Sequence, residues 1–318
     1  MPNMEDSTIS GTRPERDFEW LSEYLNDARS VHADFVRQVD RIQSGSLLFH
    51  YTDLTGLKAI ASEHDLWLTH ALYCNDEAEM KHGIRIARDQ IQLLNNEPGG
   101  PPPRRQYLEQ LDAALSEPPR EGAYICCFCD KGDDLSQWRA YGGDGNGVSI
   151  QIDPNAFVEY AGVHPFGFLA IWNVFYRPEQ QQQIMRTALE STYTKFAHLP
   201  AEEIVRKARD VIDFFVPTFK HDGFGGENEW RMIFVPSPVS PVKPHYRARR
   251  DMLIPYYCVK ELVLSLGIVS EEMWRLPIRQ VCIGPNRHRE LNRACAQSLL
   301  TDNGYDCPAI ASETPYRS

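Results

Sequence analysis

An apolar, strand-like run that opens with two carboxylates limits what this chain can fold into more than any other segment. Residues 227–235 read Glu-Asn-Glu-Trp-Arg-Met-Ile-Phe-Val. Side chains of a strand point alternately to its two faces, so Glu227, Glu229 and Arg231 are expected on one face and the bulky residues between them on the other. The sequence therefore predicts a pair of acids at the mouth of a strand.

Two further segments offer partners for these acids. Residues 47–52, Leu-Leu-Phe-His-Tyr-Thr, read as a short strand with His50 on the face opposite the preceding Phe. Residues 135–143, Leu-Ser-Gln-Trp-Arg-Ala-Tyr-Gly-Gly, read as a polar and aromatic turn that carries Tyr141 and leads into an alternating strand at 147–152. A His, a Tyr and a Glu thus follow one another in three separate segments.

The order His50, Tyr141, Glu229 resembles the His-Tyr-Glu arrangement of the ADP-ribosyltransferases, the fold of poly-ADP-ribose polymerases and diphtheria-type toxins. More narrowly, the blocks FHYT, LSQWRAYG with GVSI, NEWR, VCIGPN and the C-terminal SETPYRS resemble a mostly bacterial family, domain-of-unknown-function family 2971, from about residue 47 to residue 318. The resemblance implies an α+β fold with a split mixed or antiparallel sheet and NAD as substrate, and the apolar pattern of the sequence adds helical insertions and a long N-terminal helix.

The chemistry of NAD explains why these residue types belong together. Cleavage at the nicotinamide-ribose bond releases a neutral ring and needs no general acid, but it develops positive charge on the ribose. A carboxylate hydrogen-bonded to the ribose 2′-hydroxyl stabilises that charge by a few kcal/mol. The resemblance gives this role to Glu229. It also implies that Tyr141 stacks on the nicotinamide ring and that His50 forms a hydrogen bond to the adenosine ribose. Glu227 matches the position that activates the acceptor in arginine-modifying transferases, so it is a candidate to orient the nucleophile.

The same resemblance implies further contacts to NAD. The backbone at Tyr51 and Thr52 would hold the nicotinamide amide, although transferases usually carry Gly where Tyr51 stands, so this ring would crowd or reshape the amide pocket. Other contacts are expected from the Tyr141 block and from the strand that follows Glu229: Ser136, Trp138, Arg139 and Arg231.

Each of the three motif residues also has a purely structural interpretation. Glu229 and Arg231 form a plausible same-face ion pair at a strand edge. His50 could be a hydrogen-bonded strand histidine, and Tyr141 a turn tyrosine packed beside glycines. A catalytically inactive binding module is therefore an alternative to an enzyme.

Three functions stay open from the sequence. The first is an NAD-dependent ADP-ribosyltransferase, or an NAD glycohydrolase with water as acceptor, suited to a bacterial toxin or anti-phage defence effector with an unspecified protein or nucleic-acid acceptor. The second is an inactive nucleotide- or protein-binding module of the same fold, which Tyr51 favours. The third is a nuclease-like hydrolase with a metal on Glu227 and Glu229.

Composition narrows the partners. The formal charge of −11 over 318 residues argues against a non-specific grip on nucleic-acid phosphates. One basic cluster, residues 245–250, could meet a pyrophosphate or an acidic target, or be a solvated loop. No run suits a membrane span or a signal peptide, so a cytoplasmic location is expected, with the eight cysteines reduced. Residues 126–129, Cys-Cys-Phe-Cys, read as a buried strand, and no metal site is expected.

The helical pattern suggests how the chain is organised. Thr12 and Glu15 have capping-box spacing, and apolar residues recur at helical steps from Phe18 to Ile42, which predicts a long helix that packs on its own domain or forms a homodimer. We therefore expect a tail and helix at 1–45 and one domain at 46–318. A helical insertion at about 75–120 would cover the NAD cleft, select the target or simply pack. Residues 259–268 are expected to form a strand.

Overall fold

The computed structural model describes residues 18–31, 47–74, 77–116, 122–237, 240–249 and 251–316. Its helices are α1 Phe18–Val31, α3 Leu54–Glu63, α4 Glu77–Asn95, α5 Pro102–Ala114, α6 Leu135–Ala140, α7 Pro178–Phe196, α8 Ala201–Phe215, α9 Val259–Leu264 and α10 Arg289–Asp302. Short 3₁₀ helices are η1 Ala71–Tyr73, η2 Pro154–Tyr160, η3 Val216–Thr218 and η4 Asp222–Glu227. Its strands are β1 Leu48–Thr52, β2 Trp67–His70, β3 Tyr124–Cys129, β4 Val148–Ile152, β5 Gly162–His164, β6 Gly167–Asn173, β7 Glu229–Pro236, β8 His245–Arg249, β9 Met252–Cys258, β10 Ile278–Ile283 and β11 Ala309–Ala311.

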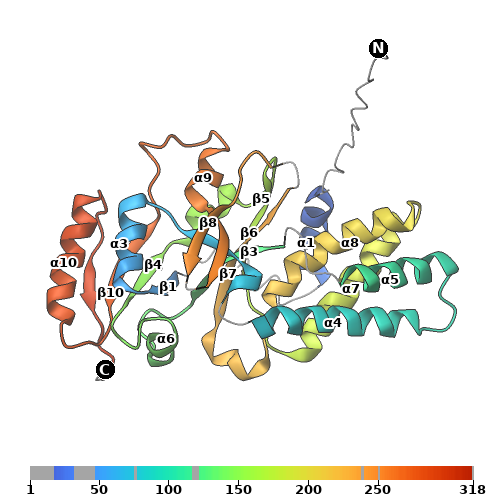
Figure 1. Ribbon diagram of the computed structural model, residues 1–318, viewed down its shortest axis with the longest axis horizontal. Coiled ribbons are helices and arrows are strands. Elements are labelled where there is room, and N and C mark those ends of the chain that lie inside the picture. Colours follow the sequence, from blue (N-terminus) through green and yellow to red (C-terminus); the bar gives the residue numbers. More distant parts are fainter. Residues whose placement is uncertain are drawn as a thin grey trace, which may run out of the picture.

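The strands form one mixed sheet, which confirms the predicted α+β class. Its main path runs β11-β10-β4-β1-β3-β2-β9-β8, and β7, β6 and β5 branch from β3. All of these pairs are antiparallel except β10 with β11. Figure 1 shows this sheet in the left and central part of the molecule, with helices on both sides of it.

The sheet forks at β3. One edge of β3 pairs with β7 along its whole length. The other edge is shared by two strands: β2 pairs with it at Thr69↔Ile125 and β1 pairs with it at Phe49↔Cys129. Among the described strands, the part of this edge between the two pairings has no ladder partner, so β1 and β2 diverge and leave a gap.

Strand β7 confirms the alternation that the sequence predicts. Ile233 and Val235 join the core beneath the helices α1, α4, α5, α7 and α8, whereas Met232 and Phe234 join a second core under α3, α9 and α10. Every residue of β7 is buried. Because both faces of β7 pack on apolar layers, Glu229 and Arg231 are held in the interior rather than at a solvated edge.

Five helices make up a layer on one side of the sheet. Figure 1 shows α4, α5, α7 and α8 packed along one another, with α1 beside α8. Helix α8 buries Ile204, Ala208, Val211 and Phe215, whose spacing of four, three and four residues places them on one helical face. The helices expected at about 75–120 are present as α4 and α5, which pack in this layer.

Two local expectations were wrong. Residues 259–268 begin with helix α9 and not with a strand, because Val259, Leu262 and Val263 are buried at helical spacing. The amide of Lys260 also donates to Asp65 Oδ1 at 2.8 Å, which caps the first turn from a distant segment. The Tyr141 block is not a simple turn: it contains α6.

The N-terminal helix is described only as α1, and residues 32–42 of the expected longer helix lie outside the described residues, as does the expected domain boundary at 45–46. Within the described part of the chain, no helix is long and apolar enough to cross a membrane.

The C-terminal segment packs against α6. Asp133 Oδ1 accepts hydrogen bonds from Ser312 Oγ at 2.5 Å and Thr314 Oγ1 at 2.8 Å, and its Oδ2 accepts from the Glu313 amide at 2.8 Å. Tyr316 donates to Asp144 Oδ1 at 2.7 Å. These contacts tie residues 312–316 to the loop on either side of α6.

Candidate functional site: a cleft at the fork of the sheet

A cleft of about 580 Å³ opens where β1 and β2 leave β3. His50 reaches it from β1, Tyr141 from the end of α6, Glu227 from the end of η4 and Glu229 from the start of β7. The structure therefore brings the four residues expected to carry the chemistry into one cavity. Other residues of its lining are Thr52, Trp67, Thr69, Glu79, Cys127, Gln137, Lys220, Phe224, Arg231, Arg247 and Arg249.

Glu229 is buried and doubly paired. Arg231 donates to it through Nε at 2.7 Å and through Nη2 at 2.9 Å. Lys220 Nζ lies 3.1 Å from its Oε2. Burial alone would raise the pKa of Glu229, but the charge and hydrogen bonds of Arg231 and the charge of Lys220 outweigh it and lower the pKa to about 2. The carboxylate is thus ionised at neutral pH, and the same-face pair with Arg231 is present.

Lys220 is the residue of the cleft that the sequence did not reveal. Its side chain is only 4 % exposed, and its ammonium lies 2.9 Å from Glu79, 2.6 Å from Glu227 and 3.1 Å from Glu229. Burial opposes the charge of Lys220, yet the neighbouring carboxylates raise its pKa above the ordinary value. No sequence signal places it here, because Glu79 comes from α4, Glu227 from the end of η4 and Glu229 from the start of β7.

Tyr141 projects into the cleft beside the acids. It follows the last turn of α6, its side chain is 38 % exposed, and its hydroxyl donates to Glu227 Oε1 at 3.2 Å. Glu227 itself ends η4, and Asn228 has a left-handed φ of 45°, which turns the chain into β7. Tyr176 supports this turn by accepting a hydrogen bond from the Glu229 amide at 2.9 Å.

His50 is held in a defined tautomer. Its Nδ1 lies 2.9 Å from the backbone oxygen of Cys127, which can only accept, so Nδ1 carries the proton. Burial lowers the pKa of His50, despite the opposing effect of that hydrogen bond, and the ring is neutral at pH 7. A neutral ring leaves Nε2 as a hydrogen-bond acceptor. His50 is therefore a hydrogen-bonded strand histidine that also lines the cleft.

Tyr51 and Thr52 take different roles. Thr52 lines the cleft at the end of β1. Tyr51 also borders it, but its hydroxyl donates to the Lys131 oxygen at 3.0 Å and accepts from the Asp134 amide at 3.1 Å. Its ring meets Trp138 edge-on at 4.7 Å. The Tyr51 side chain is thus committed to holding the N-terminus of α6, instead of being free to crowd an amide pocket.

Three residues expected to contact NAD lie outside the cleft lining. Trp138 is completely buried and donates a hydrogen bond through Nε1 to Asp133 Oδ1 at 2.7 Å, so its side chain anchors α6 to the core. Ser136 bonds to Asp134, which caps the helix. Arg139 lies over the ring of Tyr316 at 5.1 Å. On this short helix the cleft side is taken by Gln137 and by the residues at its end.

The far end of the cleft is basic and aromatic. The 245–250 cluster is not a loop over its described part: residues 245–249 form β8, and Arg247 and Arg249 project into the cleft from it. Arg247 Nη2 donates to Thr69 Oγ1 at 3.0 Å, and the guanidinium lies 5.2 Å from the ring centre of Trp67. The cleft therefore has three carboxylates at one end and two arginines at the other.

One group of potential metal ligands exists among the described residues, outside the cleft. The ligand atoms of His245, Cys258 and Glu261 lie within 4.8 Å of one another. His245 Nε2 already contacts Glu261 Oε2 at 2.8 Å. Burial and the neighbouring Asp65 raise the pKa of Cys258, so without a metal ion this side chain is a protonated thiol.

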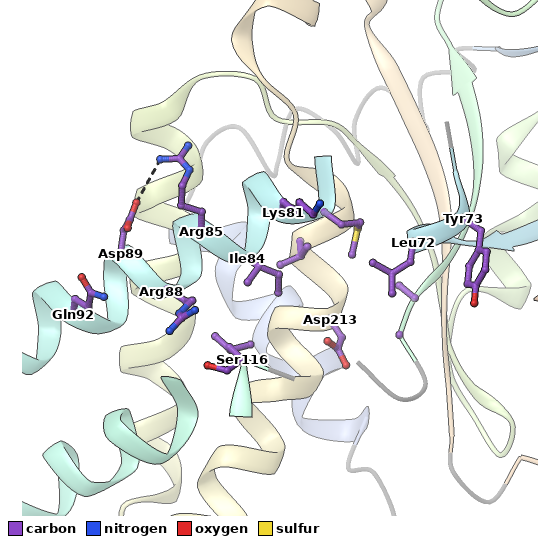
Figure 2. Close-up of a pocket in the computed structure, with 15 residues that line it drawn as sticks. Leu72, Tyr73, Lys81, Ile84, Arg85, Arg88, Asp89, Gln92, Ser116 and Asp213 are labelled. Atoms are coloured by element: carbon purple, nitrogen blue, oxygen red, sulfur yellow. Dashed lines mark ion pairs between the residues drawn. The ribbon is translucent and has the colours of Figure 1, made fainter. Parts of the chain in front are cut away.

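A second cavity, of about 760 Å³, lies among the helices. Figure 2 shows part of its lining: Arg88 of α4 lies on the side of Ser116, whereas Arg85 and Asp89 of the same helix pair with each other. None of the expected site residues contributes to it. It borders Ser116 and Gly122, which flank residues outside the described part of the chain, and it carries no functional assignment here.

The fold and the cleft together define an α+β protein with a strongly charged cleft at the fork of a mixed sheet. Residues 137–232 match the model of the family described as "Protein of unknown function (DUF2971)". The expected resemblance to this family is therefore confirmed over residues 137–232, a segment that contains Tyr141, Glu227, Glu229 and Arg231 but not His50. No curated protein and no solved structure matches the chain.

Proposed function

We propose that this protein cleaves NAD at the nicotinamide-ribose bond and transfers ADP-ribose to a protein or nucleic-acid acceptor, or to water. The observation that carries the proposal is the convergence of His50, Tyr141 and Glu229, from three distant segments, on one cleft. Glu229, ionised and fixed by Arg231, supplies a preorganised negative charge where positive charge develops on the ribose. Because its charge is fixed before the reaction, little reorganisation is needed.

The other residues suit the same reaction. Tyr141 offers a partly exposed ring at the acidic end, where a cationic nicotinamide would be attracted to its face. The neutral His50 offers Nε2 as an acceptor for a ribose hydroxyl. Glu227 lies within hydrogen-bond distance of Tyr141, so an acceptor hydroxyl or water bound beside it would stand near the reacting carbon. A bacterial toxin or an anti-phage effector would use such a reaction.

A second candidate is a nucleotide-binding module without turnover. The observation that favours it is the saturation of Glu229, which accepts from Arg231 and contacts Lys220 before any ligand is present. If these bonds persist in the complex, Glu229 holds the cleft together and the ribose hydroxyl finds no free acceptor. The two candidates share the ligand and differ in whether nicotinamide is released.

The metal-dependent hydrolase is less well supported by the geometry. Lys220 Nζ lies between Glu227 and Glu229, at 2.6 and 3.1 Å, where a divalent ion bridging these acids would have to bind. A metal ion would therefore have to displace a buried ammonium that also pairs with Glu79 at 2.9 Å. Nicotinamide release that is unaffected by a chelator is the expected behaviour.

The test is the release of free nicotinamide from NAD by the purified protein and its Glu229→Gln variant, with and without cell extract as a source of acceptor. Release by the wild type and a loss of at least about 100-fold in the variant would support the proposal. Dependence on extract would separate transfer from hydrolysis. Binding of NAD without any release would refute cleavage and select the binding module.

Two variants of Tyr141 provide a matched control. Tyr141→Phe keeps the ring and removes only the hydrogen bond to Glu227, whereas Tyr141→Ala removes the ring as well. Because this side chain is 38 % exposed, neither change should unfold the protein. A ring that stacks on nicotinamide predicts a rise in KM for Tyr141→Ala of about tenfold and a small effect for Tyr141→Phe. Equal effects of the two changes would contradict stacking.

A further inference from the structure

The proposed reaction uses the acidic end of the cleft. It gives no role to the two arginines at the other end. Arg247 and Arg249 stand two residues apart on β8, so their side chains leave the same face of the strand. Both line the cleft. They stand on the hairpin partner of β9, which pairs with β2, so β8 lies beyond the β2 arm of the fork.

The register places these arginines on the same side of the sheet as Glu229. Thr69, which accepts from Arg247, pairs with Ile125 of β3, and Glu229 pairs with Cys129 of the same strand. Positions 125 and 129 are four residues apart and therefore project from one face. The Arg247 guanidinium reaches back to β2, which lies two strand spacings from β7, roughly 10 Å. A ligand in the cleft that contacts both ends must be an extended one.

The electrostatics of the basic end are uncompensated. Within the described residues neither Arg247 nor Arg249 forms an ion pair, and the buried Nε of Arg247 has no hydrogen-bond partner. Burial, and next the positive charge of Arg249, lower the pKa of Arg247. A buried donor without a partner and two like charges facing one cavity both cost free energy, and a bound anion would relieve both costs.

The aromatic neighbour fixes the geometry of this end. Trp67 is 41 % exposed and lies under the Arg247 guanidinium at 5.2 Å from the ring centre. Stacking on the ring and the bond to Thr69 leave the planar fork of Arg247 preorganised, which suits bidentate recognition of phosphate oxygens.

We propose that Arg247 and Arg249 of β8, with Trp67 beneath Arg247, form the subsite of the cleft that binds the phosphate groups of a nucleotide. The inference rests on the proposed function for the identity of that nucleotide as NAD. It adds the residues that hold the pyrophosphate and the direction of binding: nicotinamide toward Glu229 and the phosphates toward β8. A cationic ring would then meet the acidic end and the anionic phosphates the basic end.

Two ligands separate the phosphate subsite from the reaction. ADP-ribose has both phosphates but no bond to cleave, and nicotinamide riboside has the bond but no phosphate. In the Arg247→Gln/Arg249→Gln variant we expect ADP-ribose to bind at least about tenfold more weakly by titration calorimetry. The kcat/KM for nicotinamide riboside should stay within about twofold, and the KM for NAD should rise by the same factor as the dissociation constant of ADP-ribose.

The matched control removes the same charge elsewhere. Lys58 on α3 and Arg105 on α5 are exposed, and the variant Lys58→Gln/Arg105→Gln lowers the net charge equally without touching the cleft. Arg249→Gln alone provides a second test, because Arg249 is exposed and its loss should leave the fold intact, with about a threefold to tenfold weaker affinity for ADP-ribose. Circular dichroism would verify folding of each variant.

The outcomes of the two hypotheses are distinguishable. Loss of ADP-ribose binding in the arginine variants supports the subsite even if the wild type releases no nicotinamide, in which case only the proposed reaction fails. Unchanged ADP-ribose binding and an unchanged KM for NAD would overturn the subsite even if NAD is cleaved. Failure of the wild-type protein to bind ADP-ribose at millimolar concentration would also overturn it.

Discussion

Replacing Lys220 with Met tests whether the cleft is held together by its charges. Wild-type Lys220 and Arg231 face the carboxylates of Glu79, Glu227 and Glu229, so the cluster carries 2 − 3 = −1. Loss of the ammonium changes the net charge of the cluster to 1 − 3 = −2. The site is buried, since the side chain of Lys220 is only 4 % exposed. Removing one partner of a buried ion pair typically costs about 3–5 kcal/mol.

The expected loss is measurable by thermal and denaturant unfolding. With about 2 °C per kcal/mol for a chain of this size, Lys220→Met should lower Tm by roughly 6–10 °C at pH 8. The deficit should shrink as the pH falls toward 5, because loss of Lys220 raises the pKa of Glu229 from about 2 and protonation then relieves the repulsion. The surface change Lys58→Met should leave Tm within about 1 °C.

A double variant supplies the decisive comparison. Lys220→Met/Glu227→Gln restores the cluster to 1 − 2 = −1 while Glu79 and Glu229 keep their bonds to Arg231. It should recover about half of the lost stability, since charged neighbours in one network are not additive. The reasoning would be refuted if Lys220→Met cost less than about 1 kcal/mol, or if its cost were the same at pH 8 and pH 5.

Three further outcomes follow from other parts of the structure. Asp133→Asn weakens the hydrogen-bond acceptor that holds residues 312–314, so it should lower the free energy of unfolding by about 1–2 kcal/mol and speed amide exchange of that segment; unchanged exchange would contradict the role. Hydrogen bonds hold the pKa of Asp133 below its usual value against the effect of burial, so wild-type stability should fall as the pH drops below about 4. Burial lowers the pKa of His70 to about 4, so the folded protein resists protonation and should lose up to about 3 kcal/mol between pH 6.5 and pH 4, a slope that His70→Gln should reduce in urea titrations. Gly147→Ala would place a methyl group 2.2 Å from the backbone oxygen of Thr52, so about 1–3 kcal/mol of stability should be lost, and a variant as stable as wild type by calorimetry would show that this turn can shift freely.

The sequence was sufficient for the elements whose pattern is local. The alternation of 229–235 predicted β7 and its two faces, and the helical pattern predicted the pair α4 and α5. The order His50, Tyr141, Glu229 singled out residues that the fold does bring to one cleft. The two-residue period of β7 and the order of the motif residues can both be recognised in the sequence without knowing which strands pair in the fold.

Other features depend on contacts that no local pattern encodes. Lys220 is surrounded by acids from α4, η4 and β7, so its role exists only once those elements meet. Residues 259–264 read as a strand but became helical because Asp65, far away in the sequence, caps them. Arg247 and Arg249 did carry a usable signal: arginines two residues apart in an otherwise mixed run indicate one face of a strand, which the loop interpretation missed.

The fork at β3 also restricts the shape of any molecule that uses the whole cleft. His50 contacts Cys126 and Phe128, which project from one face of β3, whereas Glu229 and Arg231 pair with Cys129 and Cys127 on the other face. A ligand that touches both His50 and Glu229 must therefore pass around the open edge of β3 and bend there. A flat, rigid compound can bind on the His50 side or on the Glu229 side of β3 but cannot contact both. The path of the β3 backbone therefore favours ligands with a rotatable linker in the middle.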